Sequence, residues 1–232
     1  MRKVTAIVLA AGSGSRMNCS TKKQFMEIKG KPIVWYSLFA FEKYGVDQII
    51  LVTGKEDIEY CRTEIVEKYG FTKVTDIVAG GKERYQSVYN GLAKVTGDIV
   101  LIHDGARPLI TKEIIGRCIK GAIEYGACVA GMPVKDTIKM VDGENVVTDT
   151  PNRSNVWITQ TPQSFSYELV KNAYDKMQGG DYRNITDDAM VVERFSDHKV
   201  RFVEGDYSNI KITTPEDIFI AELFFEKNEK KC

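Results

Sequence analysis

The sequence predicts an α/β fold, a three-layer domain in which helices cover both faces of a mostly parallel sheet. Short, almost continuously apolar runs rich in β-branched residues alternate along the chain with longer amphipathic segments. Such apolar runs are typical of strands buried on both faces, and strand–helix alternation favours right-handed βαβ crossovers. Glycine-bearing or charged loops follow several of these runs, at the sheet edge where α/β proteins bind their ligands.

The first half of the chain contains the regular strand–helix units. We expect strands at 4–9, 48–53, 74–79, 98–103 and 127–132, and helices at 33–44, 56–69, 83–95 and 111–125. The strand ends of these units therefore meet at one edge of the sheet.

The strand–helix rhythm breaks after Pro133. Short polar and β-type pieces at 137–141, 146–148 and 156–159 surround Asp142 and Gly143, a turn signal. We interpret residues 135–161 as an arm that projects from a single domain spanning 1–232, and not as a second domain.

Helical patterns resume in the last third of the chain, at 167–177 and 187–195, and strands are expected at 200–204 and 209–212. The last helix has a clear start signal. Thr214 has the character of an N-cap, Pro215 suits the first helical position, and acidic residues follow in the first turn.

Composition limits the classes of partner. Lys plus Arg and Asp plus Glu are equal at 32 each, so no overall field favours nucleic acid or an anionic membrane. The five cysteines are scattered and form no CxxC pair, a pattern typical of reduced thiols in a cytosolic protein. We see no signal-peptide pattern and no apolar stretch of the ~20 residues that a membrane span needs. We therefore expect a cytoplasmic protein.

The loop after the first strand has the composition of a phosphate-binding loop. It contains Gly12 and Gly14, and it carries Arg16, Lys22 and Lys23. Glycine lets the backbone approach a ligand, exposed N–H groups form an anion-binding concavity, and the cations add full charges. The spacing matches neither the Rossmann fingerprint nor the P-loop. An ordinary turn is the alternative, and it leaves the coincidence of small residues and cations unexplained.

Polar residues also follow the third and fourth strands. Gly80 and Gly81 open a helix whose N-terminus favours anions or polar base edges. Asp104 can hold Mg²⁺ through one direct contact while phosphates supply the other oxygens, although a turn-capping role is the alternative. Arg107 can present its fork to a phosphate, and a surface salt bridge is the alternative.

Two features late in the chain also suit anions. Lys211 lies in a short apolar strand, where a lysine either extends to water or meets an anion, and we favour the anion. Thr186, Asp187 and Asp188 open a helix; capping explains them, but the same N-terminus could receive a phosphate. The sequence shows no Ser/His/Asp or Cys/His arrangement of the kind that activates a covalent nucleophile.

Taken together, these motifs resemble a known family. They resemble nucleotidyltransferases that make nucleotide-activated sugars and alcohols, and most closely the 2-C-methyl-D-erythritol 4-phosphate cytidylyltransferases. The resemblance covers nearly the full chain in order and rests on the motifs at Ala10–Gly12 with Gly14 and Arg16, Lys23–Phe25, Gly80–Gly81 with Arg84 and Ser87, 103–108, 133–139, Arg153–Ser154 with Trp157, 160–165 and 209–211.

The resemblance implies a Rossmann-like nucleotidyltransferase domain that converts CTP and methylerythritol phosphate into the CDP-alcohol and pyrophosphate, for non-mevalonate isoprenoid synthesis. It also implies a need for Mg²⁺ and a homodimer joined through the arm. A ribitol-5-phosphate cytidylyltransferase remains an alternative because it shares the fold, the nucleotide and most motifs. A non-catalytic nucleotide-binding regulator is less favoured, since Arg16, Lys23 and Asp104 are all present.

The family's functional residues map onto three groups of positions. The resemblance implies catalytic roles for Arg16, Lys23 and Lys211. It implies nucleotide contacts at Ala10, Ala11, Gly12, Gly14, Gly81, Ser87, Asp104 and Gly105, with Asp104 as the metal ligand. It implies substrate contacts at Arg107, Thr137, Arg153, Thr186 and Lys211, with Thr137 and Arg153 donated across the dimer.

Overall fold

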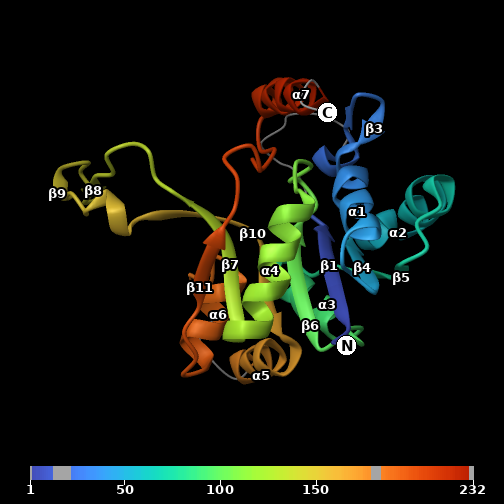
Figure 1. The fold of residues 1–232 in the computed structure, drawn as a ribbon, viewed down its shortest axis with the longest axis horizontal. Helices are drawn as coiled ribbons and strands as arrows, with labels where there is room; N and C mark the ends of the chain where they lie inside the picture. The colour runs from blue at the N-terminus through green and yellow to red at the C-terminus, as the bar shows by residue number, and fades with distance from the viewer. Residues whose placement is uncertain (1, 13–21, 179–183, 230–232) are drawn as a thin grey trace.

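A computed structural model describes residues 2–12, 22–178 and 184–229 (Figure 1). Within these residues the central sheet has seven strands in the order β11-β7-β10-β6-β1-β4-β5. The strands are β1 (Val4–Ala10), β4 (Gln48–Thr53), β5 (Val74–Ala79), β6 (Ile99–Asp104), β7 (Ala127–Pro133), β10 (Trp157–Ser166) and β11 (Arg201–Glu204). Neighbouring strands are parallel except around β10, which is antiparallel to both β6 and β7. The predicted mostly parallel α/β fold is confirmed.

Helices cover both faces of this sheet. One face packs against α1 (Ile33–Lys43) and α4 (Lys112–Tyr125), and the other against α3 (Arg84–Leu92), α5 (Tyr167–Met177) and α6 (Asp188–Phe195). Successive side chains of a strand alternate between faces, so Ala6 and Val8 lie in the first core while Ile7 lies in the second. Burial on both faces explains why the strands are apolar almost without interruption.

Local signals set the helix ends. Thr111 caps α4, where its Oγ1 accepts a hydrogen bond from the N–H of Ile114 at 3.4 Å, and Gly126 ends that helix at φ +76°. Asp187 caps α6, where Oδ1 accepts from the N–H of Met190 at 2.9 Å. The helix start that the sequence predicted near Thr186 therefore belongs to Asp187.

Two sequence-based expectations are wrong in detail. The helix expected at 56–69 is a 3-10 turn (Lys55–Asp57), the short α2 (Ile58–Tyr60) and a π-helical stretch (Cys61–Glu67). Side-chain periodicity marked its buried face but did not determine its hydrogen-bond register. Residues 209–212 form no strand: Ile212 donates a single backbone bond to the carbonyl of Ala106, which lies in a loop that offers no strand edge.

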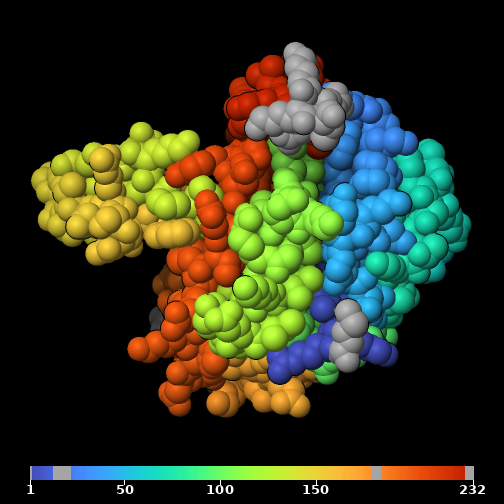
Figure 2. Space-filling view, in the orientation of Figure 1, coloured from blue at the N-terminus to red at the C-terminus, as the bar shows by residue number. Residues whose placement is uncertain are grey.

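The chain leaves the sheet between β7 and β10. Residues 134–156, called the arm below, include the antiparallel pair β8 (Met140–Val141) and β9 (Val147–Asp149) and a 3-10 turn (Arg153–Asn155). The arm extends sideways from the body of the molecule as a separate lobe (Figures 1 and 2). Residues 157–161 of the expected arm belong to β10, whose Trp157 pairs with Pro133 of β7.

A small third core closes the end of the molecule where β1 and β6 terminate. The short hairpin of β2 (Glu27–Ile28) and β3 (Lys31–Pro32) and the last helix α7 (Pro215–Glu229) contribute to it. Asp217 fixes the start of α7, because its Oδ2 accepts from the N–H groups of Thr213 and Thr214 at 2.7 and 2.9 Å. Among the residues described, no helix combines the length and apolar character that crossing a bilayer requires.

Candidate active site

A cavity of about 360 Å³ lies at the carboxyl ends of β1, β5 and β6. The predicted site residues that line it are Ala10, Ala11, Gly12, Lys23, Gly81, Ser87, Asp104 and Lys211. They come from segments far apart in the sequence, and the sheet topology brings their strand ends together. Gly14 and Arg16 lie outside the described residues.

The N-terminus of α3 packs closely against the end of β1. A Cβ added at Gly80 would lie 2.5 Å from the Cβ of Ala11 and 2.7 Å from Oγ of Ser87, so only glycine fits there. The N–H of Gly81 donates to Ser87 Oγ at 3.0 Å. This packing turns the first helical turn of α3 towards the cavity, where a helix N-terminus favours an anion.

Asp104 is the acidic centre of the site. Its residue is only 8% exposed, its Oδ2 lies 2.8 Å from Nζ of Lys211, and its Oδ1 lies 3.4 Å from Nε of Arg84. Burial alone would raise the pKa of this carboxyl, but the cations Arg84, Lys211 and Arg107 hold it well below its usual range. The group is therefore a carboxylate throughout the physiological pH range.

Arg84 is a member of the site to which the sequence analysis gave no role. Its Nη1 and Nη2 donate to the two oxygens of Asp188, each at 2.8 Å, and the hydroxyl of Tyr174 donates to Asp188 Oδ1 at 2.6 Å. The position of Arg84 at the start of a helix after two glycines could have signalled a site residue. Nothing local signalled Asp188, since a second acid in a first helical turn is ordinary.

A ring of hydrogen bonds fixes the loop that follows Asp104. The N–H of Asp104 donates to Thr161 Oγ1 at 3.1 Å, and Thr161 Oγ1 lies 3.0 Å from Nδ1 of His103. Nε2 of His103 lies 3.2 Å from the carbonyl of Arg107. Arg107 Nη1 donates to the carbonyl of Asn209 at 2.7 Å, and Asn209 Nδ2 donates to the carbonyl of Thr161 at 3.0 Å. The ring ties β6 to β10 and to the segment that carries Lys211.

The two adjacent lysines after the first loop have different surroundings. Lys23 lines the cavity, and its Nζ donates to the carbonyl of Ile212 at 3.3 Å. Lys22 instead pairs with Asp57 at 2.6 Å and with Glu56; burial lowers its pKa, but these two carboxylates raise it overall. The sequence predicted that both lysines serve the phosphate-binding loop, whereas the structure brings Lys23 to the cavity and pairs Lys22 with Asp57 and Glu56.

Gln24, also without a role in the sequence analysis, holds the end of β1 in place. Its Nε2 donates to the carbonyls of Ala10 and Gly12 at 2.6 and 3.2 Å. Because the two backbone carbonyls are occupied by this amide, the backbone of this short segment is held against the wall of the cavity.

A second cavity of about 290 Å³ adjoins the first and shares Arg84, Asp104 and Lys211 with it. Arg107 and Thr186, both predicted on the substrate side, line this smaller cavity. Gly105 is buried, its N–H donates to the carbonyl of Leu9 at 2.9 Å, and it lines neither of these two cavities.

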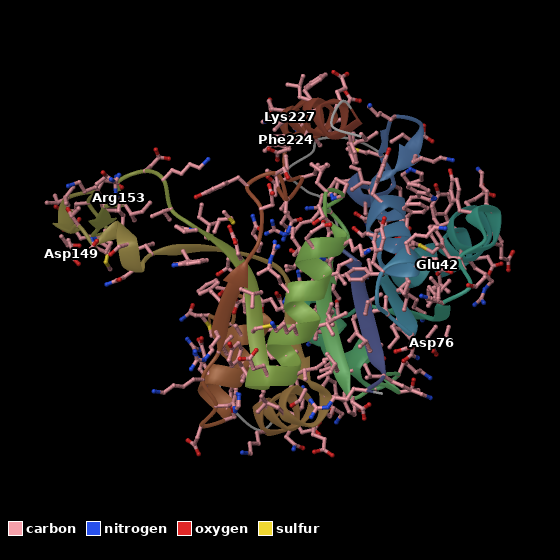
Figure 3. The ribbon with its side chains drawn as sticks, in the orientation of Figure 1. Glu42, Asp76, Asp149, Arg153, Phe224 and Lys227 are labelled. Atoms are coloured by element: carbon pink, nitrogen blue, oxygen red, sulfur yellow. The ribbon has the colours of Figure 1, made fainter. Side chains whose placement is uncertain are left out.

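Thr137 and Arg153 lie on the arm, away from both cavities. Both are exposed, and Arg153 makes a long 3.5 Å contact from Nη1 to the carbonyl of Lys135. Figure 3 shows Arg153 near the outer end of the arm. The fold of one chain therefore does not bring these two residues to the other predicted site residues.

The residues at the site fit a divalent cation that takes one ligand from the protein and most of its other oxygen ligands from bound phosphate groups. The described part of the chain contains no group of three or more His, Cys, Asp or Glu side chains arranged to enclose a metal ion. Asp104 faces both cavities, and a single carboxylate together with phosphate oxygens is a common way to hold Mg²⁺.

Comparison with known proteins identifies the family of this chain. The family model described as IspD, 2-C-methyl-D-erythritol 4-phosphate cytidylyltransferase, matches residues 4–227. The enzymes of this name from Lachnoclostridium phytofermentans and Caldanaerobacter subterraneus are 48% and 50% identical to the chain, over 99% and 97% of its length and 99% of their own. The crystal structure of 4-diphosphocytidyl-2C-methyl-D-erythritol synthase from Anaerococcus prevotii superimposes with a TM-score of 0.84 at 35% identity, covering 97% of this chain and 99% of that one. The chain belongs to the IspD family of 2-C-methyl-D-erythritol 4-phosphate cytidylyltransferases.

Proposed function

We infer that this chain transfers CMP from CTP to 2-C-methyl-D-erythritol 4-phosphate and releases pyrophosphate, in the non-mevalonate route to isoprenoid precursors. Membership of the IspD family over residues 4–227 carries this inference. The geometry supports it, because Lys23, Asp104 and Lys211 converge on one cavity at the strand ends. The similar enzymes reported above act, by their names, on methylerythritol phosphate, so ribitol phosphate is not the favoured substrate.

We propose that CTP occupies the larger cavity. The backbone at Ala10, Ala11 and Gly12 and the start of α3 at Gly81 and Ser87 would surround the nucleotide, and Gly14 and Gly105 belong to the same proposed set. The packing of Gly80 against Ala11 supports this role, because it brings two anion-favouring backbone segments to one wall.

The proposed chemistry is an in-line displacement at the α-phosphorus of CTP. An oxygen of the substrate phosphate attacks, and pyrophosphate leaves. A phosphate monoester is already an anion near neutral pH, so the reaction needs positioning and charge stabilisation and no strong general base. Lys23, Lys211 and Arg16 are the proposed catalytic cations, with Lys211 and Lys23 on the wall of the same cavity.

The smaller cavity is the proposed site of the alcohol phosphate. Arg107, Thr186 and Lys211 line it, and Asp104 lies on the boundary that it shares with the larger cavity. We propose Mg²⁺ as the divalent metal, with Asp104 as its protein ligand and the triphosphate as the source of further oxygens. When bound, the ion would neutralise charge on the leaving pyrophosphate.

We propose that the site is completed by the arm of a second copy of the chain in a homodimer. Thr137 and Arg153 are the proposed contacts to the substrate phosphate, and neither lines either of the two cavities described above. Apolar side chains of the arm support an interface, since Met140, Val141, Val146 and Val147 are all more than half exposed. The chain would thus act as one domain with an arm.

We propose a cytoplasmic location. Cys61, Cys118 and Cys128 are buried free thiols, in keeping with a reducing compartment.

A substrate screen tests the proposed function. The purified protein is mixed with Mg²⁺, each of the four common nucleoside triphosphates, and either methylerythritol phosphate or ribitol 5-phosphate, and pyrophosphate release is followed. We expect release with CTP and methylerythritol phosphate. Preference for ribitol phosphate would contradict the proposed substrate. Tight CTP binding without pyrophosphate release would favour a non-catalytic nucleotide-binding regulator.

A further inference from the structure

Starting from the proposed function, we propose that Asp188 and Tyr174 are positioning residues for the reaction. They hold the guanidinium of Arg84 and so keep the carboxylate of Asp104 available to a divalent cation and the substrate phosphates. Both side chains are fully buried and line neither cavity.

Three helices build this support. Asp188 begins α6 and is fully buried, Tyr174 belongs to α5 and is also fully buried, and Arg84 begins α3. Both oxygens of Asp188 accept from Arg84 at 2.8 Å, which is a bidentate pairing of a planar fork with a carboxylate. The hydroxyl of Tyr174 donates a further hydrogen bond to Oδ1 of the same carboxylate at 2.6 Å.

Arg84 divides its donors unequally between two carboxylates. Its Nε lies 3.4 Å from Oδ1 of Asp104, which is well beyond the ~2.7–2.9 Å of a strong charge-assisted hydrogen bond. The guanidinium is therefore committed to Asp188 and only weakly engages Asp104. Both Arg84 and Asp104 line both cavities, so this division of donors sits at the boundary between the proposed nucleotide and substrate sites.

How Arg84 shares its N–H groups between Asp188 and Asp104 determines how readily the Asp104 carboxylate can bind another cation. Without the charge of Asp188, Arg84 would be a partly buried cation, its side chain 29% exposed, and the other carboxylate that it contacts is Asp104. A partly buried cation that loses one of two opposite charges is attracted to the one that remains, so the guanidinium would turn towards Asp104 and pair with it closely. That pairing would compete with a divalent cation for the same oxygens. Groups that orient a metal ligand in this way typically change metal affinity by about 10–100-fold when removed.

The test compares Asp188→Asn with the unmodified protein. Asparagine keeps the shape of the side chain and removes its charge. We expect the Mg²⁺ concentration for half-maximal pyrophosphate release to rise by about 10–100-fold, with kcat at saturating Mg²⁺ within roughly threefold of the unmodified protein. Tyr174→Phe keeps the ring in the core and removes one hydrogen bond, so we expect a shift in the same direction of about threefold to tenfold.

Asp175→Asn is the matched control. Asp175 follows Tyr174 on α5, but its carboxylate is exposed and pairs with Lys171 on the same helix. Removing this charge should leave the Mg²⁺ dependence unchanged.

A binding measurement gives a readout independent of turnover. Electron paramagnetic resonance of Mn²⁺ reports how much of the ion is bound to the protein with CTP, and we expect weaker binding in both Asp188→Asn and Tyr174→Phe. Circular dichroism checks that each variant is folded. If Asp188→Asn does not fold, the Mg²⁺ dependence and Mn²⁺ binding of Tyr174→Phe test the proposal instead.

A folded variant whose Mg²⁺ and Mn²⁺ dependences stay within about twofold of the unmodified protein would overturn the proposal. So would a loss of kcat that saturating Mg²⁺ does not restore. Failure of the unmodified protein to release pyrophosphate is a different result, because it contradicts the proposed function.

Discussion

The carboxyl edge of the sheet and the arm both carry predicted functional residues, but these residues are buried and hydrogen-bonded at the sheet edge and exposed on the arm. At the sheet edge, Asp104 is 8% exposed and meets Lys211 at 2.8 Å, and a ring of hydrogen bonds fixes its backbone. On the arm, Thr137 and Arg153 are exposed, and the apolar side chains of Met140, Val141, Val146 and Val147 are more than half exposed. One region is organised within a single chain, and the other presents a surface that another molecule would have to cover.

This difference has an energetic basis. Residues at strand ends inherit their position from the buried sheet, whose two cores oppose any shift of a strand. The arm has two short strands of two and three residues and no comparable core among the described residues, so its geometry depends on contacts beyond its own chain. Four predictions test this comparison, in order of decreasing expected effect.

Phe165→Ala tests whether the sheet edge depends on the core beneath it. Phe165 lies on β10 and is fully buried, so truncating its ring should lower the free energy of unfolding by about 3–5 kcal/mol. Urea denaturation measures the change. The matched control is Phe219→Ala on α7, where the ring is 67% exposed and the expected change is within about 0.5 kcal/mol. Equal effects at the two positions would contradict the assignment of Phe165 to the core.

Lys23→Ala tests the catalytic side of the comparison. Removing one preorganised cation from the cavity should lower kcat by about a hundredfold or more, equivalent to about 2.7 kcal/mol of transition-state stabilisation. Steady-state pyrophosphate release measures it. Lys22→Ala is the control, because Lys22 pairs with Asp57 and Glu56, and we expect a change of only a few-fold. Similar losses for the two variants would show that the distinction between the adjacent lysines is wrong.

The pH dependence of stability tests the hydrogen-bond ring at the sheet edge. Burial lowers the pKa of His103 from 6.5 to about 4. Because the unfolded chain takes up this proton first, the stabilisation is intact above about pH 6.5 and declines as the pH falls, by about 2 kcal/mol at pH 5. Urea denaturation between pH 7 and 5 measures the slope. In His103→Gln the slope should flatten over this range, and an unchanged slope would assign it to other groups.

Arg153→Ala tests the arm. If the arm serves a second copy of the chain, the KM for methylerythritol phosphate should rise by about tenfold, or about 1.4 kcal/mol, while CTP binding stays unchanged. Lys139→Ala removes another cation of the arm, one that donates to Thr150, and should leave both values unchanged.

Mixing subunits sharpens this last prediction. In a mixed dimer of Lys23→Ala and Arg153→Ala chains, one of the two sites would combine a cavity that keeps Lys23 with an arm that keeps Arg153. At a methylerythritol phosphate concentration well below KM, where Arg153→Ala alone should give about a tenth of the unmodified rate, random mixing should therefore restore about a quarter of the unmodified rate. Activity no higher than that of the two separate variants would mean that Arg153 does not act across subunits.

The regular part of the fold and much of the cavity wall could be predicted from the order of residues alone. The strands at 4–9, 48–53 and 74–79 lie within β1, β4 and β5, and Lys23, Asp104 and Lys211 line one cavity. These features could be predicted because they depend on local patterns: apolar periodicity sets the strands, and parallel strands end at a common edge.

Other features of the fold and the site became known only from the three-dimensional arrangement. Strand β10 enters the sheet antiparallel between β6 and β7, Arg84 pairs with Asp188 across 104 positions of the sequence, and residues 209–212 form no strand. It also separated Lys22 from Lys23 and left Arg153 away from both cavities. Such outcomes depend on which distant side chains become neighbours when the cores pack, and the local order of residues does not contain that information.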